Sequence, residues 1–373
     1  MLYFKIPNNN RIVIYKEFFE DFRFIQNSII KNINKGYIIT NNNINLICLL
    51  TIFFSINSIK ALIYDGLKIA YLVNYINLLN PKLVITSIDN DLNFYKLKKF
   101  CPGIKFISFQ NGFRRQKNDF FETLNNEKKL SCDYFYTWGH KITNEYKKYI
   151  KAKYIIFGSL KTYYAKKNLL KKKDTLIYIS STKVNIPNID KNKTIEFFKE
   201  YTAYEEKLLK LLSKYCLSQN FNLTILKRSS SIDEELYFRN IIQRKMKFIK
   251  IPTNQTIKKY NILGNYKVAI SILSSLGLEN ISLGRKTVFF PPNEKKGNSF
   301  FQGMDISWPH KTKNNNLYFF KDPNFKIMSN ILNRIIKMNT FSWKIRTSKL
   351  KETILPPNEK KFKNLLKTLS PYM

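Results

Sequence analysis

The sequence predicts an α/β protein made of two halves with mostly parallel sheets and a cleft between the halves. Three observations support this fold class. Short apolar strands alternate with helical stretches over nearly all of the 373 residues, a pattern typical of parallel sheets covered by helices. Residues 82–88 (KLVITSI) are almost continuously apolar, as expected for a strand that is buried on both faces. A lysine-rich stretch at residues 161–173 interrupts the pattern, which then restarts.

In the first half, apolar runs predict strands at residues 11–15, 36–40, 82–88, 105–109, 134–138 and 154–157. Apolar residues at helical spacing predict helices at residues 44–56, 61–79 and 93–100. The second of these helices should end before Pro81, because the residue that precedes a proline avoids the helical conformation. The strand at 105–109 leads into the turn Gln110-Asn111-Gly112.

In the second half, the same criteria predict strands at residues 175–180, 222–226, 248–251, 268–272 and 287–290. Helices are predicted at residues 195–220, 276–283 and 362–369, and Gly284 has the position of a C-terminal cap glycine for the second of them. We therefore expect an N-terminal domain at residues 1–165, a second domain at residues 166–345 and a C-terminal helical tail at residues 346–373.

The chain is strongly basic: 64 Lys and Arg residues against 26 Asp and Glu give a formal net charge of +38. Such an excess favours a polyanionic partner, a membrane surface or an anionic substrate. The lysines are scattered, however, and the chain is rich in Lys, Asn and Ile, a bias that an AT-rich genome would also produce. The charge is therefore weak evidence for nucleic-acid binding, and no specific nucleic-acid partner is expected.

The cysteines and histidines exclude two classes of small scaffold. Four cysteines lie far apart without a C-x-x-C pair, and the chain has only two histidines, so neither a disulfide framework nor a structural zinc site is expected. No signal peptide is visible, and the most apolar window, residues 46–56, is shorter than the roughly 20 residues that span a bilayer. We expect a cytoplasmic protein with peripheral contact to the inner face of the cell membrane.

The strongest local signal for chemistry is the segment from Ser274 to Glu279. Ser274 and Ser275 should stand at a helix N-terminus, where unpaired N–H groups and the helix dipole favour a phosphate. Gly277 would let a ligand approach the backbone, and Glu279 can accept hydrogen bonds from sugar hydroxyls. The competing interpretation is that a serine only caps the helix while Glu279 complements its dipole.

Two further polar groups follow predicted strands. Asp89 and Asp91 come after the strand at 82–88, where ligand sites of parallel sheets lie, so either carboxylate is a candidate general base. The alternatives are that Asp91 caps the next helix, or that the D-x-D pair holds a divalent ion. After the strand at 105–109, Arg114 and Arg115 can clamp an anion, whereas Asn111-Gly112 taken alone is an ordinary turn.

The segment that contains Ser274 resembles the donor-binding element of GT-B glycosyltransferases and of the related CDP-glycerol-type polyol-phosphate transferases. In those enzymes a Ser/Thr-rich turn leads into a G-x-E-A-like helix and then a G-[KR]-x-[VT] strand; Asn280 here replaces the usual Ala. The resemblance implies a GT-B-like fold of two Rossmann-type domains. It also implies that Ser274, Ser275 and Gly277 bind donor phosphate and that Glu279 binds donor hydroxyls.

The loop that begins at Gln110 resembles the Q-H-G or W-H-G loop of surface-polysaccharide and teichoic-acid transferases, in which the His is the general base. Asn111 stands in the His position and has no titratable proton, so it can only orient a hydroxyl or phosphate. The resemblance implies acceptor or phosphate binding by Gln110, Gly112 and Arg114. It leaves Asp89, ahead of Asp91, as the candidate base.

Weaker elements occur in the same order as in these transferases. Trp138-Gly139-His140 and Phe157-Gly158-Ser159 match strand ends that line the cleft, and His140 is a candidate imidazole base for which a surface-loop role is favoured. Ser180 matches a small polar donor-facing residue. Lys227 and Arg228 occupy a K-x-H-P position whose His-Pro is absent, and they can still pair with a phosphate.

Taken together, the resemblance implies a glycosyltransferase of surface-polysaccharide (O-antigen or capsule) biosynthesis. Its substrates would be a nucleotide-activated sugar and a glycan or lipid-linked acceptor, and it would need no metal or resident cofactor. Within the same fold, a polyol-phosphate transferase or a nucleotide-sugar epimerase is the alternative. A basic nucleic-acid-binding protein and an inactive scaffold are the alternatives from other classes.

Overall fold

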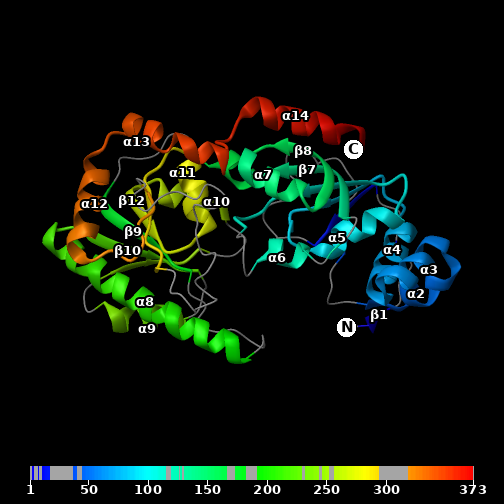
Figure 1. Cartoon of the computed structure of the whole chain (residues 1–373), viewed down its shortest axis with the longest axis horizontal. Coiled ribbons are helices and arrows are strands. Elements are labelled where there is room, and N and C mark those ends of the chain that lie inside the picture. The colour runs from blue at the N-terminus through cyan, green and yellow to red at the C-terminus, as the bar shows by residue number, and fades with distance from the viewer. Residues whose placement is uncertain are drawn as a thin grey trace. The chain divides into compact units, whose positions relative to one another are not determined.

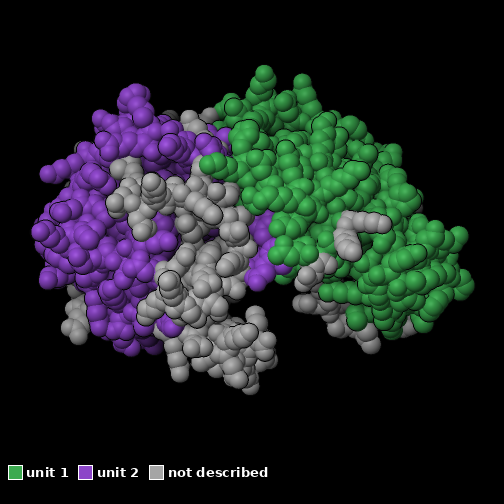
Figure 2. Space-filling model, in the orientation of Figure 1, with its two compact units in different colours: residues 1–112, 123–163, 357–373 green, residues 113–122, 164–356 purple. Residues whose placement is uncertain are grey.

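The computed structural model describes residues 2–3, 7, 11–16, 37–39, 44–114, 119–125, 127, 130–165, 173–181, 191–228, 232–242, 246–251, 256–293 and 318–372. The chain forms two compact units (Figure 2). Unit 1 comprises residues 1–112, 123–163 and 357–373, and unit 2 comprises residues 113–122 and 164–356. The residues expected to form a separate C-terminal tail are thus divided between the two units.

Unit 1 contains a six-stranded parallel sheet (Figure 1). Its strands are β2 (Ile12–Tyr15), β3 (Tyr37–Ile39), β5 (Leu83–Thr86), β6 (Lys105–Phe109), β7 (Leu130–Thr137) and β8 (Ile150–Ile156). They are ordered β3-β2-β5-β6-β7-β8, and β1 (Leu2–Tyr3) pairs separately with β4 (Ile44–Asn45). The chain passes from β2 to one side and then returns to the other, so the topological switch point of this sheet lies between β2 and β5.

The helices of unit 1 are α2 (Leu46–Leu50), α3 (Ile56–Asp65), α4 (Leu67–Leu79), α5 (Leu92–Leu97) and α7 (His140–Lys147), with short 3₁₀ turns η1 (Thr51–Phe54), η2 (Lys98–Phe100) and η3 (Leu160–Tyr164). Helix α6 (Phe120–Leu124) is divided between the units, because residues 120–122 belong to unit 2. The single helix predicted at residues 61–79 is wrong. Gly66 has a φ of +82°, which glycine adopts at little cost, and the chain breaks there into α3 and α4. The helix predicted at 44–56 is likewise divided into β4, α2 and η1.

The C-terminal helix α14 (Glu359–Leu369) belongs to unit 1 because of its apolar face. Leu365 and Leu369 are buried in the core that Ile14, Ile85 and Ile107 form on the sheet. Among the described residues, no single helix is long and apolar enough to cross a membrane. The pair formed by residues 46–54 and α3 meets that test only when taken together, and it bends by 99°.

Unit 2 contains a five-stranded parallel sheet. Its strands are β9 (Lys173–Ile179), β10 (Asn222–Leu226), β11 (Lys247–Ile249), β12 (Tyr266–Ser271) and β13 (Thr287–Phe289), ordered β11-β10-β9-β12-β13. The switch point here lies between β9 and β12, as in a Rossmann half. The helices are α8 (Lys191–Ser218), α9 (Ile232–Ile241), α10 (Thr256–Leu263), α11 (Ser275–Ser282), α12 (Phe325–Lys337) and α13 (Thr340–Arg346), followed by η4 (Ser348–Glu352).

Candidate functional site

In unit 1, polar residues gather where the parallel strands end. Lys16 follows β2, Asp89 and Asp91 follow β5, and Asn111 follows β6. This edge is the carboxyl edge of the sheet, and the pair β2–β5 is its switch point. Parallel α/β sheets bind ligands at this position, because the strand order reverses there and leaves a crevice between the loops.

Asp89 is fully buried, and its carboxylate is engaged on both sides. One oxygen accepts the backbone N–H of Asn111 at 3.0 Å, and the other accepts the hydroxyl of Tyr146 at 2.5 Å. The hydroxyl of Tyr95 donates to the backbone carbonyl of Asp89 at 2.8 Å, and burial raises the pKa of Tyr95 well above its usual value, which keeps this phenol a donor. The predicted role of Asp89 as a base that meets an acceptor hydroxyl does not fit a side chain with no exposed surface.

Asp91 has the geometry of a helix cap. Its side chain accepts the backbone N–H of Asn93 at 3.0 Å at the start of α5, and it forms an ion pair with Lys16. The Tyr15 hydroxyl also donates to it, at 3.3 Å. Burial, and next the charge of Asp91, raise the pKa of Tyr15 well above its usual value. The structure therefore favours the capping interpretation of Asp91 over catalysis.

The loop after β6 is fixed to β7 by Gln110. The side-chain oxygen of Gln110 accepts the backbone N–H of Trp138 at 2.8 Å, and its backbone carbonyl accepts the indole N–H of the same residue at 2.9 Å. The Gln110 amide donates to the carbonyl of Gly112 at 2.9 Å. Gln110 is buried, so its side chain positions the loop, and the predicted role in acceptor binding does not fit.

Arg114 is also buried, and Arg115 lies outside the described residues.

Asn111 lines a depression at the carboxyl edge together with Ser87, Ser159 and Lys161. The ammonium of Lys161 donates to the backbone carbonyl of Asn111 at 3.0 Å. Within the described residues, the Ser87 hydroxyl is buried without a hydrogen-bond partner, and the lining of the depression also includes the apolar Phe109 and Leu160. Sequence reasoning missed Ser87, Lys161 and Tyr146, because single polar residues after a strand carry no pattern until the sheet order places them together.

His140 stands on the same edge. It is the first residue of α7, directly after Trp138 and Gly139 at the end of β7, and it is exposed. Because Gln110 holds Trp138, the loop that carries Asn111 and the start of α7 are fixed to each other. His140 is thus an exposed imidazole at the end of the strand next to β6.

In unit 2, the switch point lies between Ser180, which follows β9, and the segment after β12 that leads to Ser274. The hydroxyl of Ser180 donates at 2.7 Å to Glu234, a fully buried acid in the first turn of α9. Glu234 also accepts the backbone N–H of Arg228 at 2.9 Å. Glu234 was not found by sequence reasoning, and it fixes the ends of β9 and β10.

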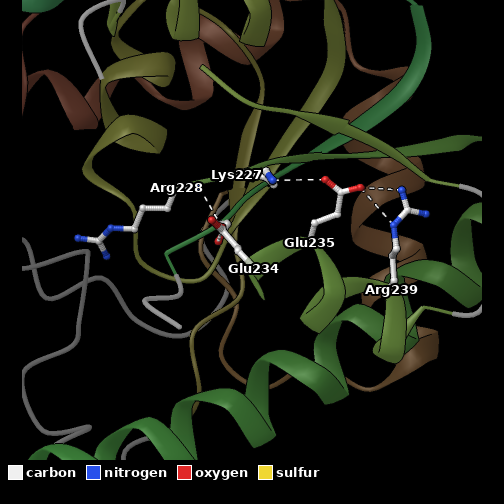
Figure 3. A network of polar contacts seen from close by, with 6 residues as sticks. Lys227, Arg228, Glu234, Glu235 and Arg239 are labelled. Atoms are coloured by element: carbon white, nitrogen blue, oxygen red, sulfur yellow. Dashed lines mark hydrogen bonds and ion pairs between the residues drawn. The ribbon is translucent and has the colours of Figure 1, made fainter. Parts of the chain in front are cut away.

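Lys227 and Arg228 differ in how much of their charge is available (Figure 3). The buried ammonium of Lys227 lies 3.3 Å from Glu235, which also binds Arg239 at 2.7 Å. Arg228 points away from this network, and its exposed guanidinium donates at 2.7 Å to the backbone carbonyl of Ser181. Of the two predicted phosphate ligands, Arg228 is therefore the one whose charge faces solvent.

The two serines at the start of α11 have different environments. Ser274 is the N-terminal cap residue by position, yet its partly exposed side chain makes no capping hydrogen bond. The hydroxyl of Ser275 accepts the backbone N–H of Phe113 at 3.0 Å within unit 2. Neither serine has the simple capping role that competed with phosphate binding in the sequence.

Gly277 and Glu279 face the interior of unit 2 instead. A Cβ at Gly277 would stand 2.6 Å from the ring of Phe289, so the missing side chain serves close packing of α11 on β13 and leaves no opening for a ligand. The carboxylate of Glu279 is buried and accepts the hydroxyl of Tyr260 on α10 at 2.8 Å. The predicted contacts of these two residues with a donor do not fit this geometry.

Among the described residues, no group of three His, Cys, Asp or Glu side chains is placed to hold a metal ion. The four cysteines are free and buried, which agrees with the absence of a C-x-x-C pair. Each unit has its own candidate site at the carboxyl edge of its sheet. One carries Asn111, Ser87, Lys161 and His140 in unit 1, and the other carries Ser180, Ser274, Ser275 and Arg228 in unit 2.

These two Rossmann-type units define a GT-B-like fold, and comparisons with known proteins agree. MnaA of S. aureus, solved with UDP, matches 97% of this chain and 96% of its own at a TM-score of 0.54 and 10% identity. A Listeria monocytogenes protein assigned as a UDP-N-acetylglucosamine 2-epimerase matches 97% of each chain at the same score and identity. A variant of the wall teichoic acid polymerase TagF soaked with CDPG matches 98% of this chain and 89% of its own, at 0.51 and 10%.

The family is shown by sequence. Residues 107–370 match the model of a protein family described as "putative O-antigen biosynthesis protein". Since this match spans most of the chain, the protein belongs to that O-antigen biosynthesis family. No curated protein sequence matches the chain.

Proposed function

We propose that this protein is a glycosyltransferase that moves a sugar from a nucleotide-activated donor to a glycan or lipid-linked acceptor during surface-polysaccharide synthesis. The observation that carries the proposal is the carboxyl edge of unit 2. There, Ser274 at the start of α11 follows β12 and makes no capping hydrogen bond with its side chain, and the exposed Arg228 follows β10 in the same Rossmann sheet. Membership of the O-antigen biosynthesis family supports the proposed pathway, and the GT-B-like fold supports the proposed class of enzyme.

The donor phosphate belongs at the start of α11 in this proposal. The first N–H groups of a helix lack partners within the helix and carry partial positive charge, which favours a phosphate. Ser274 supplies a hydroxyl and Arg228 a guanidinium that can bind phosphate oxygens. Glu234 stabilises this edge by accepting hydrogen bonds from the Ser180 hydroxyl and the Arg228 backbone N–H. In this proposal, Glu234 does not contact the donor.

The acceptor and the proton belong to unit 1. Asp89 is buried and satisfied, so we assign it the role of holding the Asn111 loop, and we assign the role of general base to His140. An imidazole is well suited to take a proton from a hydroxyl near neutral pH. Asn111 would orient that hydroxyl, because in the described part of the chain its side-chain amide has no hydrogen-bond partner.

The enzyme would act in the cytoplasm at the inner face of the cell membrane, where activated sugars and lipid-linked acceptors meet. A net charge of +38 favours this location, since basic residues near anionic lipid each add roughly 1 kcal/mol of attraction. A nucleotide-sugar epimerase is the second candidate, because two of the structural relatives are MnaA with UDP and an assigned 2-epimerase. A polyol-phosphate transferase is the third, by the likeness to TagF.

A nucleotide panel tests the donor site. We expect one nucleoside mono- or diphosphate to raise the melting temperature by a few degrees at saturation, and Ser274→Ala and Arg228→Ala each to weaken its binding about tenfold. Arg239→Ala is the matched control, because Arg239 is an exposed arginine of the same polar network that faces Glu235. A shift that survives both site substitutions would remove this donor site.

The products then distinguish the candidate reactions. Incubation with the matching nucleotide sugar and a lipid-linked glycan should release the nucleotide and extend the glycan by one sugar. A change in the configuration of the nucleotide sugar without an acceptor would instead identify an epimerase. Transfer of a polyol phosphate from a CDP-polyol would identify the third candidate.

A further inference from the structure

Exposed apolar side chains are concentrated in one short part of unit 1. Of the fourteen large hydrophobic residues that are exposed in the described part of the chain, eight lie within residues 44–67. They are Ile44, Leu50, Phe53, Phe54, Ile56, Ile63, Tyr64 and Leu67. Phe54 has 88% of its surface exposed, an unusual state for a phenylalanine in water.

These residues come from elements that pack together. The helices α2, α3 and α4 and the turn η1 contact one another, and Figure 1 shows the three helices gathered at one end of unit 1. We call the exposed side of α2, η1, α3 and the start of α4 the apolar face. Scattered single hydrophobic residues on a surface need no explanation, whereas eight within one segment indicate a binding surface.

Helix α3 has an apolar stripe on the side that faces solvent. Ile56, Lys60, Ile63 and Tyr64 follow the i, i+4, i+7, i+8 spacing of one helical face, and all four are exposed. The opposite side carries the buried Ser58 and Ala61. A helix that only covers a protein core would have the reverse order, with its large apolar residues inside and its small polar residues outside.

The charges around the apolar face are positive. Lys60 and Lys68 are exposed on α3 and α4, and the one acid between residues 44 and 79, Asp65, is paired with Lys99 at 3.2 Å. The ammonium of Lys99 also lies 4.9 Å from the ring centre of Tyr64. Apolar and aromatic residues with lysines at their border match the interface of an anionic bilayer, in which rings sit at the headgroup level and lysines reach the phosphates.

The shape of the segment favours surface insertion over a transmembrane span. Residues 46–54 and α3 are together long and apolar enough to span, but they bend by 99°, and each alone is short. A bent pair of short helices can insert its apolar side into the headgroup region while its other side stays packed on α4.

We propose that the apolar face is a membrane-docking surface that inserts into an anionic phospholipid bilayer. This proposal rests on the proposed function for its purpose, because a lipid-linked acceptor is presented at such a surface. The contact itself needs neither donor nor acceptor, so lipid binding and nucleotide binding can be measured separately on the same protein.

The test is flotation of the full chain with vesicles of phosphatidylcholine containing about one third phosphatidylglycerol. Phe54→Ser/Ile56→Ser removes two exposed apolar side chains of the face, and Phe341→Ser/Ile345→Ser removes the same residue types from α13 in unit 2. We expect the first pair to reduce vesicle binding at least about tenfold and the second to leave it unchanged. A Phe54→Trp variant should show a blue-shifted emission only when these vesicles are present.

Three results would overturn the proposal: no binding of the unaltered chain to the vesicles, equal loss in both double variants, or an unchanged emission of the Trp reporter. Light scattering without lipid tests whether the apolar face binds a second copy of the chain instead. A dimer that dissociates in Phe54→Ser/Ile56→Ser and stays intact in Phe341→Ser/Ile345→Ser would assign the face to that second copy and would also overturn the proposal. The nucleotide-induced thermal shift of that double variant is the control on folding, and it should equal the shift of the unaltered chain. Loss of vesicle binding with the shift retained separates membrane docking from the donor site.

Discussion

The carboxylate of Asp89 accepts the backbone N–H of Asn111 at 3.0 Å, across 22 positions of sequence and between the ends of neighbouring strands. This single bond ties the loop after β5 to the loop after β6. Tyr146 donates to the second oxygen from α7, so three elements meet at one buried charge. The arrangement of the loops at the carboxyl edge of unit 1 therefore depends on Asp89, which the sequence analysis proposed as the catalytic base.

Replacement of Asp89 should mainly lower the stability of the protein, because Asp89 is a structural residue and not the general base. Asp89→Ala leaves the Asn111 N–H and the Tyr146 hydroxyl without their acceptor, and we expect it to lower the free energy of unfolding by about 2–4 kcal/mol. Asp89→Asn keeps one acceptor oxygen and should cost about half as much. Urea denaturation measures both. If Asp89→Asn were fully stable yet lost transferase activity by a thousandfold or more, Asp89 would be the base after all.

Gly277→Ala should destabilise unit 2 although alanine favours helices. The added Cβ would lie 2.6 Å from the Phe289 ring, and this fully buried ring has little room to move, so we expect a cost of about 1–3 kcal/mol. Phe289→Leu shortens the neighbour and should recover part of that cost in the double variant. Denaturation of both single variants and the double variant completes the cycle, and strict additivity would contradict the proposed contact.

Asp133 predicts a pH dependence of stability in unit 1. Its burial raises the pKa, but the hydrogen bond from Lys98, the backbone N–H of Phe106 and the charge of Lys105 outweigh burial, so the pKa is lowered. A lowered folded-state pKa contributes stability above the unfolded value of about 4, and this stability is lost as the pH falls through the folded value.

The matching substitution is Asp133→Asn, and it should cost about 1 kcal/mol at pH 7 and almost nothing below the folded-state pKa. Denaturation curves at several pH values measure the difference. A cost that stays constant down to pH 2 would show that the carboxylate charge is not what stabilises the native state.

His140→Asn tests the assignment of the general base. The asparagine cannot take up the proton of an acceptor hydroxyl, so we expect kcat to fall by about 10²–10⁴-fold while nucleotide binding is retained. Turnover assays and a nucleotide titration of the variant measure the two effects. A kcat equal to that of the unaltered enzyme would place the base elsewhere.

The sequence was a good guide to the strands and a poorer one to the helices. The strands at Lys105–Phe109 and Asn222–Leu226 were predicted to the residue, because continuous apolar runs bounded by polar residues have one interpretation in a parallel sheet. The break at Gly66 was missed, since helical spacing continues on both sides of it. Helices α9, α10, α12 and α13 were not predicted, although α12 carries the buried Met328, Ile331, Leu332 and Ile335 at helical spacing.

The candidate site residues were also predicted with mixed success. Ser274, Ser275 and Arg228 were predicted from residue type and their place after strands, and the structure puts them at the carboxyl edge of the unit 2 sheet. Their role as donor ligands stays a prediction. Asp89, Gln110 and Glu279 were found by the same reasoning, yet they are buried and bound by the protein. Residue type and position along a strand do not reveal whether a polar side chain faces solvent or a buried donor.

The sequence by itself determined the α/β class, the parallel strands, the strand ends at which polar residues gather, and the excess of positive charge. These follow from local periodicity and composition, which every segment carries independently of its neighbours. Only the tertiary structure decided the strand order, the buried state of Asp89, and the outward direction of Phe54 and Ile63. Those properties depend on contacts between residues that are distant along the chain, and a hydrogen bond such as that of Asp89 with Asn111 exists only once the sheet has formed.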